Sequence, residues 1–287
     1  MNKKKINIFI IILIYLFIYI IFRNSNNLSN ITFLSLKMYI LKVFPFLFIM
    51  MILNNLLIKC NLPYYFNKIF KNNDLYIFFS SILSGSPINA VILKNYLEND
   101  YITVKKASKI LAYTSFNNPL FLYNYLHLIL NNNYNVIKVM GILYISNFIL
   151  YIYFNKKNNS QSFIKYKEYN LKKELFNSIY ESIQNLIKIM GIIIFFKIIL
   201  DLLMIKDSIC YSLLKGLVEV TTGLNDLVNF NISIKIKEII SYIIISFMGL
   251  SIQMQMSIIL EKYNIDYKYF YTSRVFIIAL GIILIIL

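Results

Sequence analysis

Residues 219–223 are the part of this sequence best suited to chemistry, because they place Glu-Val-Thr-Thr-Gly inside a long apolar run. A carboxylate in such a stretch is costly unless it is paired, solvated or protonated. Glu219 could take up a proton, coordinate a cation with Thr221 and Thr222, or accept hydrogen bonds from a bound molecule. The structural alternative is an ion pair with Lys215, one helical turn earlier on the same face. We favour the functional interpretation.

Three further stretches interrupt apolar runs: Ser-Gly-Ser-Pro-Ile-Asn at 84–89, Asn-Asn-Pro at 117–119, and the segment around Gly249. Glycine and proline break helices and leave backbone groups free. At membrane depth such groups are tolerated only when they are buried in protein or line a wet cavity. A half-helix starting at Pro87 would present free amides to a ligand. The structural alternative is a hairpin packed through small residues.

The four interruptions together predict one binding site for a substrate or an ion. Its candidate residues are Ser84, Gly85, Ser86, Pro87, Asn89, Asn117, Asn118, Pro119, Glu219, Thr221, Thr222, Gly223, Gly249, Ser251 and Gln253. Gln253 and Gln255 are two residues apart, so at most one of them should face a cavity. Lys197 and Asp201 are four apart in an apolar helix, and we expect them to neutralise each other.

The elements that hold these residues must be membrane helices. Apolar residues make up 59% of the 287 residues and charged residues 15%, too few charges for the surface of a water-soluble domain of this size. The formal net charge of +16 comes from lysines clustered between the apolar blocks, as the positive-inside rule requires. We therefore expect a lipid bilayer as partner, and no nucleic acid.

Catalytic and metal chemistry find little support in the sequence. Cys60 and Cys210 are isolated, and His127 is the single histidine, so no metal or disulfide framework is expected. His127 is better explained as an interfacial side chain. No GxSxG-like motif surrounds a serine, and we predict that the protein is not an enzyme.

The apolar blocks divide the chain into an N-terminal helix and two similar halves. The blocks are 6–22, 36–59, 75–93, 106–130, 136–154, 183–205, 209–230, 236–260 and 270–287. We predict an N-terminal transmembrane helix over 1–30, a first repeat over 31–154, a basic cytoplasmic linker over 155–178, and a second repeat over 179–287. Each repeat has a full helix, an interrupted segment, a broken helix and a full helix.

Charge predicts how these elements cross the membrane. With the N-terminus in the cytoplasm and residues 75–93 as a re-entrant hairpin, residues 94–106 and the lysine-rich linker both fall on the cytoplasmic side. The second half then starts on the opposite side from the first. The predicted fold is all-α, with two inverted repeats that each contain a re-entrant helical hairpin and a broken helix.

Several of these motifs resemble a known family in their order and spacing. Ser-Gly-Ser-Pro at 84–87, Asn-Pro-Leu-Phe at 118–121, residues 216–223 and residues 247–255 are similar to the sporulation integral membrane protein YlbJ family. The resemblance covers about residues 30–287. That family carries the nucleoside-recognition, or gate, domain, distantly like concentrative nucleoside transporters. The resemblance implies a role in endospore formation. The protein would lie in the cell membrane or the outer forespore membrane and move dipicolinate or a similar small solute.

Two functions follow as hypotheses. The preferred one is a carrier of a small polar or anionic solute held between hairpin tips and broken helices, with no cofactor except a coupling Na⁺ or H⁺. No ATP-binding motif is present. The alternative is a non-transporting membrane scaffold or assembly factor for sporulation, with a closed, dry interface between the halves. Nothing in the sequence supports oligomerisation.

Overall fold

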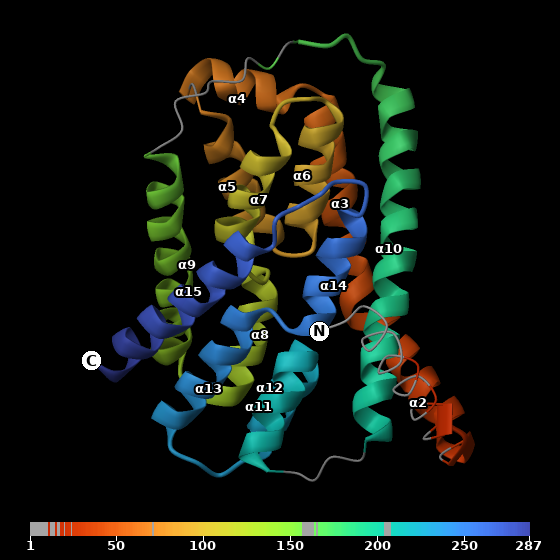
Figure 1. The fold of residues 1–287 in the computed structure, drawn as a ribbon, viewed down its shortest axis with the longest axis vertical. Coiled ribbons are helices and arrows are strands. Elements are labelled where there is room, and N and C mark those ends of the chain that lie inside the picture. Colours follow the sequence, from red (N-terminus) through yellow and green to blue (C-terminus); the bar gives the residue numbers. More distant parts are fainter. Residues whose placement is uncertain are drawn as a thin grey trace.

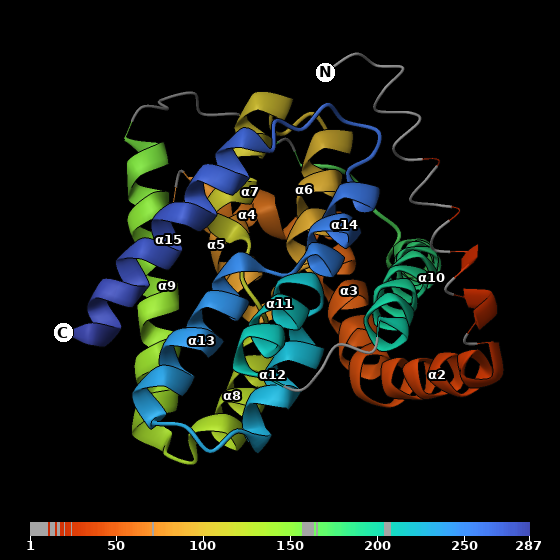
Figure 2. The ribbon, with the colours of Figure 1, turned by 60° about the horizontal axis from the view of Figure 1, so that its bottom comes forward.

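The computed structural model describes residues 11, 15, 18, 19, 21–23, 25–70, 72–156, 164, 166–203 and 208–287, and every element in these ranges is a helix. Figures 1 and 2 show the arrangement from two sides. The predicted first helix, residues 6–22, lies for the most part outside the described residues. The all-helical class is confirmed.

Within the described ranges, four helical segments are long and apolar enough to cross a membrane. They are α9 (Asn133–Asn155), α10 (Leu171–Leu202), the combined segment Ile234–Ile259, and α15 (Lys268–Ile286). Their outward faces carry exposed apolar side chains, among them Ile137 (65% exposed), Phe176 (62%) and Val275 (70%). A soluble protein would not leave such faces uncovered, whereas lipid covers them without cost.

A bent pair of helices passes the same length and hydrophobicity test when its two parts are taken together. α2 (Ser25–Met38) continues through a π-helical turn, η1 (Tyr39–Val43), into α3 (Phe44–Lys59). Pro45, in the first turn of α3, has no backbone N–H and cannot extend a regular helix backwards. The axis therefore bends, by 46° between Leu28–Leu41 and Phe44–Lys59. The short helix α4 (Leu62–Phe70) follows and runs across the top of the molecule in Figure 1.

In the first half, the predicted interruptions coincide with helix ends. α5 (Asn73–Ser84) and α6 (Ile88–Glu98) form a hairpin whose connection contains Gly85, at φ 70°. α7 (Val104–Thr114) and α8 (Pro119–Leu130) are the two parts of a broken helix, and both pack along α9. The Asn118 side chain caps α8 by accepting from the backbone N–H groups of Leu120 and Phe121.

The second half repeats the order of elements. α11 (Ile209–Val218) and α12 (Val220–Asn229) form a hairpin with Glu219 at its tip. α13 (Ile234–Phe247) and α14 (Leu250–Ile259) are separated by Met248 and Gly249, both at positive φ. In Figure 1, α5 and α6 occupy the upper half and α11 and α12 the lower half, so both hairpin tips point toward mid-height.

The linker is shorter than the sequence suggests. α10 begins at Leu171, capped by the Asn170 side chain, so residues 171–178 of the predicted linker form its first turns. These polar residues continue the apolar helix toward its capped start, and α10 packs against α3. At the contact between α3 and α10, Lys59 pairs with Glu181, with 2.8 Å between Nζ and Oε1. The first residue of an apolar stretch in the sequence is therefore not always the first residue of the helix.

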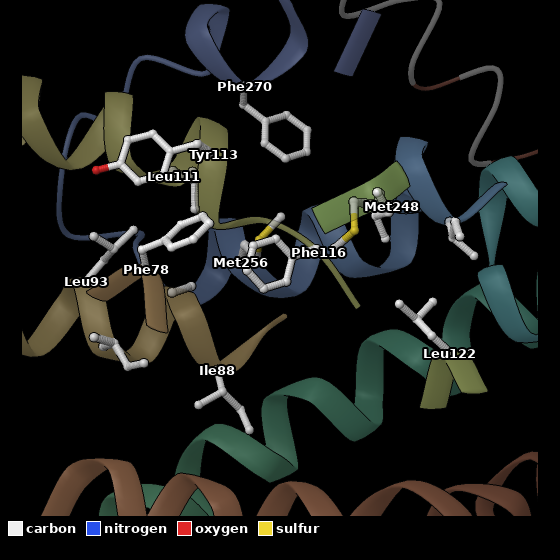
Figure 3. Close-up of a cluster of buried hydrophobic side chains, with 14 of the residues drawn as sticks. Phe78, Ile88, Leu93, Leu111, Tyr113, Phe116, Leu122, Met248, Met256 and Phe270 are labelled. Atoms are coloured by element: carbon white, nitrogen blue, oxygen red, sulfur yellow. The ribbon is translucent and has the colours of Figure 1, made fainter. Parts of the chain in front are cut away.

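One buried core joins the two halves at the level of the breaks. Figure 3 shows Phe116, from the α7–α8 connection, in a cluster with Met248 and Met256 of the second half. Phe116 and Met248 are completely buried. Methionine fills irregular gaps well, which suits a centre where several helices end.

Candidate functional site

The helix breaks line a single cavity of ≈ 520 Å³. Of the predicted site residues, its walls include Ser86, Pro87, Asn117, Asn118, Glu219 and Thr221. The first four come from the first half and the last two from the second. Gln255, one of the two glutamines considered above, and three side chains that the sequence did not single out complete the polar part of the lining: Asn124, Tyr125 and Asn225. The volume lies within the usual range for a small-molecule pocket.

Glu219 ends α11 and caps α12, and it is 4% exposed. Its Oε2 atom accepts hydrogen bonds from the Thr221 hydroxyl, from the Thr222 backbone N–H at 2.8 Å and from the Thr222 hydroxyl at 2.9 Å. The positive end of the α12 dipole also favours a carboxylate at this position. The two threonines therefore hold the carboxylate of Glu219 on the cavity wall.

The alternative prediction for Glu219, an ion pair with Lys215, is wrong. Lys215 pairs instead with Asp226, at 2.7 Å between Nζ and Oδ2. Glu219 leaves the helical path at the hairpin tip, with φ −138° and ψ 114°, so Lys215 and Glu219 do not share one helix face. Asp226 lies on the returning helix α12, beside Lys215 on α11. The buried carboxylate of Glu219 is held by hydroxyl and backbone amide donors, and the ammonium group of Lys215 pairs with Asp226 on α12.

The tip of the first hairpin packs directly on the α7–α8 break. The Ser86 backbone N–H donates to the Phe116 carbonyl at 2.8 Å, and Asn118 Nδ2 donates to the Leu83 carbonyl at 2.8 Å. A Cβ on Gly85 would lie 2.7 Å from the Asn118 Cα, so the approach requires glycine. Ser84, Asn89 and Pro119 adjoin this contact, and Asn89 Nδ2 lies 3.2 Å from the Ser115 hydroxyl.

The second hairpin meets the α13–α14 break in the same manner. A Cβ on Gly249 would lie 2.9 Å from Val220 Cγ2, next to Glu219. Gly223 packs against α11, where its Cβ would lie 2.7 Å from the Ser212 carbonyl oxygen. Close contact between hairpin tip and break is thus common to both halves.

Only one of the two glutamines lines the cavity, as their spacing predicts. It is Gln255, whose Nε2 donates to the Ser251 hydroxyl at 3.1 Å. Gln253, the predicted site residue, instead donates to the Phe247 carbonyl at 3.1 Å and caps the end of α13. The spacing predicts that only one glutamine faces the cavity but not which one, because the break at Gly249 changes the direction of the helix.

Direct hydrogen bonds connect the breaks of the two halves. Asn117 Nδ2 donates to the Ile245 carbonyl at 3.1 Å, between the α7–α8 connection and the last turn of α13. Arg274 of α15, 1% exposed, donates to carbonyl groups at the ends of both α7 and α13. The sequence analysis did not single out Arg274. The sequence does mark Arg274, because it is an ionisable residue within the last apolar block, and the same feature marked Glu219.

The remaining predictions about charged and metal-binding residues have mixed outcomes. Lys197 and Asp201 of α10 interact electrostatically, as expected, although the described residues show no contact between them within salt-bridge distance. His127 is exposed near the end of α8, and both cysteines are free. Within the described residues no group of His, Cys, Asp and Glu side chains could hold a metal ion.

The fold and the cavity define a class: a helical membrane protein whose helix breaks contribute polar groups, among them one buried carboxylate, to a largely apolar and partly open cavity. No family model, curated protein or solved structure matches the chain. Function must therefore be argued from the cavity.

Proposed function

We propose that this protein is a secondary carrier that moves a small polar solute across a membrane. The observation that carries the proposal is the ≈ 520 Å³ cavity, which is lined by helix breaks from both halves and by the carboxylate of Glu219. Breaks in membrane helices are tolerated where the backbone is buried in protein or lines a cavity, and here residues of the breaks in both halves lie on one cavity. In carriers, half-helix ends present those groups to solute and coupling ion. A scaffold would have no need of such a cavity.

The cavity favours a neutral or cationic solute that carries hydrogen-bond donors. Its polar groups are amides, hydroxyls and one carboxylate, and no Lys, Arg or His is among the described lining residues. An anionic solute would be repelled by an ionised Glu219. The dipicolinate-like anion implied by the resemblance would fit this cavity less well, because its carboxylates would face the carboxylate of Glu219. Glu219 is the proposed site of the coupling proton or Na⁺.

We also propose that the halves are inverted repeats with re-entrant hairpins. Both halves have the order hairpin, broken helix, long helix, and both pack the hairpin tip on the break. The hairpins enter from opposite ends of the molecule in Figure 1. Rocking of one half against the other would open the cavity alternately to the two sides. The resemblance adds the location: the cell membrane or outer forespore membrane of a spore-forming bacterium.

Flux into vesicles tests the carrier proposal. Purified protein would be reconstituted, and uptake of labelled nucleosides, small amines and small carboxylates, dipicolinate included, would be measured under an imposed Na⁺ or H⁺ gradient. We expect gradient-dependent uptake of one neutral or cationic solute above that of protein-free vesicles. Folded, reconstituted protein that moves no member of the panel would favour the scaffold alternative.

Cysteine labelling tests the proposed topology. In a background without Cys60 and Cys210, Tyr169→Cys in the linker should react only from the cytoplasmic side, and Asn231→Cys, between α12 and α13, only from the opposite side. The start of α10 and the connection between α12 and α13 lie at opposite ends of the molecule in Figure 1, and the lysines near the linker direct that end inward. Labelling of both from one side would contradict the re-entrant hairpins.

A further inference from the structure

Arg274 lies where two helices end in the interior of the molecule. Its Nη1 donates to the Ser115 carbonyl oxygen at 2.6 Å and to that of Ser246 at 3.3 Å, and its Nη2 donates to that of Ala112 at 2.6 Å. Ala112 and Ser115 flank the end of α7, and Ser246 lies in the last turn of α13. One guanidinium group therefore binds the broken-helix end of each half.

No carboxylate pairs with Arg274 in the part of the chain that the structure describes. Its other contacts are neutral: Asn147 Oδ1 at 3.4 Å, the Ser273 hydroxyl at 3.4 Å, and the Phe270 ring, whose centroid lies 5.1 Å from Cζ. A buried charge in a membrane protein must be compensated. Each helix carboxyl end carries about half a negative charge, so the two ends together balance about one positive charge.

We propose that the Arg274 guanidinium is a tethered cation, in the position that a free coupling cation would otherwise take between two half-helix carboxyl ends. Carbonyl groups at such ends coordinate Na⁺ in ion-coupled carriers. Here they are already occupied by a side chain. The consequence for coupling rests on the proposed carrier function: this junction takes no free cation, and Glu219 is left to bind the coupling ion. The charge-balancing role holds whether or not the protein transports.

The arrangement also makes Arg274 a positioning residue for the cavity. Ser115 and Ser246 are each within two residues of a partner in the Asn117-to-Ile245 hydrogen bond, which joins the same two breaks. Asn117 lines the cavity. Loss of the guanidinium should therefore loosen the cavity wall as well as expose the carbonyls.

Chemical rescue in detergent tests the tethered cation without any transport assay. Arg274→Ala should lower the Tm of the purified protein by about 5–10 °C, because several charge-assisted hydrogen bonds are lost. A low, non-denaturing concentration of guanidinium chloride should then raise the Tm of this variant, because the free ion can enter the vacated site. The same salt should not raise the wild-type Tm, because that site is full. Ile277→Ala is the matched control, since Ile277 is completely buried on the same helix but binds no carbonyl.

Rescue of Arg274→Ala but not of Ile277→Ala supports the proposal, and an equal response of the two variants overturns it. An unchanged Tm in Arg274→Ala also overturns it. If Arg274→Ala does not accumulate, Arg274→Lys and Arg274→Met are compared, because they are similar in size and differ in charge. The proposal requires the lysine variant to be the more stable, and equal or greater stability of the methionine variant overturns it.

Discussion

Glu219→Gln is expected to lower solute uptake by about 10–100-fold, the equivalent of one lost hydrogen bond to a charged group. Glutamine keeps the shape of the side chain and a carbonyl oxygen that can accept from Thr221 and Thr222. The hairpin should therefore fold normally, with an unchanged amount of protein in the membrane. The charge that would bind a coupling ion or a donor on the solute is removed. Uptake per molecule of reconstituted protein is the measurement.

Asp226→Asn is the matched control for Glu219→Gln. Asp226 is an acid on the same helix, α12, but it pairs with Lys215 and is not among the cavity-lining residues. Uptake by this variant should stay within about twofold of wild type, the effect expected of a partly exposed pair. Equal losses in the two variants would mean that uptake depends on the total negative charge of this hairpin and not on the carboxylate in the cavity. Reduced abundance of Glu219→Gln with normal uptake per molecule would assign Glu219 to helix capping.

Gly85→Ala is expected to destabilise the protein by about 2–6 kcal/mol, as the sum of backbone strain and overpacking. Gly85 has φ 70° and ψ −176°, a conformation that is essentially restricted to glycine. An alanine Cβ would also lie 2.7 Å from the Asn118 Cα and 2.9 Å from the Asn117 carbonyl carbon. These are backbone atoms, which cannot rotate away. The hairpin tip would have to leave the break, and the Tm in detergent should fall accordingly.

Gly141→Ala and Gly191→Ala provide the controls. Both glycines lie within long helices, α9 and α10, and a Cβ on either would meet no atom within 4 Å. Alanine should raise stability at these positions by about 0.5–1 kcal/mol, because it restricts the unfolded chain and favours helix. A Gly85→Ala protein as stable as these two would show that the hairpin tip does not pack on the α7–α8 break as described.

The sequence alone determined that the chain is helical and where its apolar stretches are interrupted. Hydrophobicity, proline and glycine act over a few neighbouring residues, so Pro119 and the glycine-containing turn at 84–87 set helix ends without reference to the rest of the chain. The same local reasoning identified Glu219, because a carboxylate in an apolar run is conspicuous in any fold.

Only the tertiary structure decided which groups meet. Lys215 pairs with Asp226 on the neighbouring helix and not with Glu219, because the chain reverses at the hairpin tip. Gln255 lines the cavity instead of Gln253, because the break at Gly249 redirects α14. Arg274 finds its acceptors on α7 and α13, more than 150 residues and 28 residues away in sequence. Helix formation depends on local spacing, whereas each of these contacts depends on how separate helices end and pack against one another.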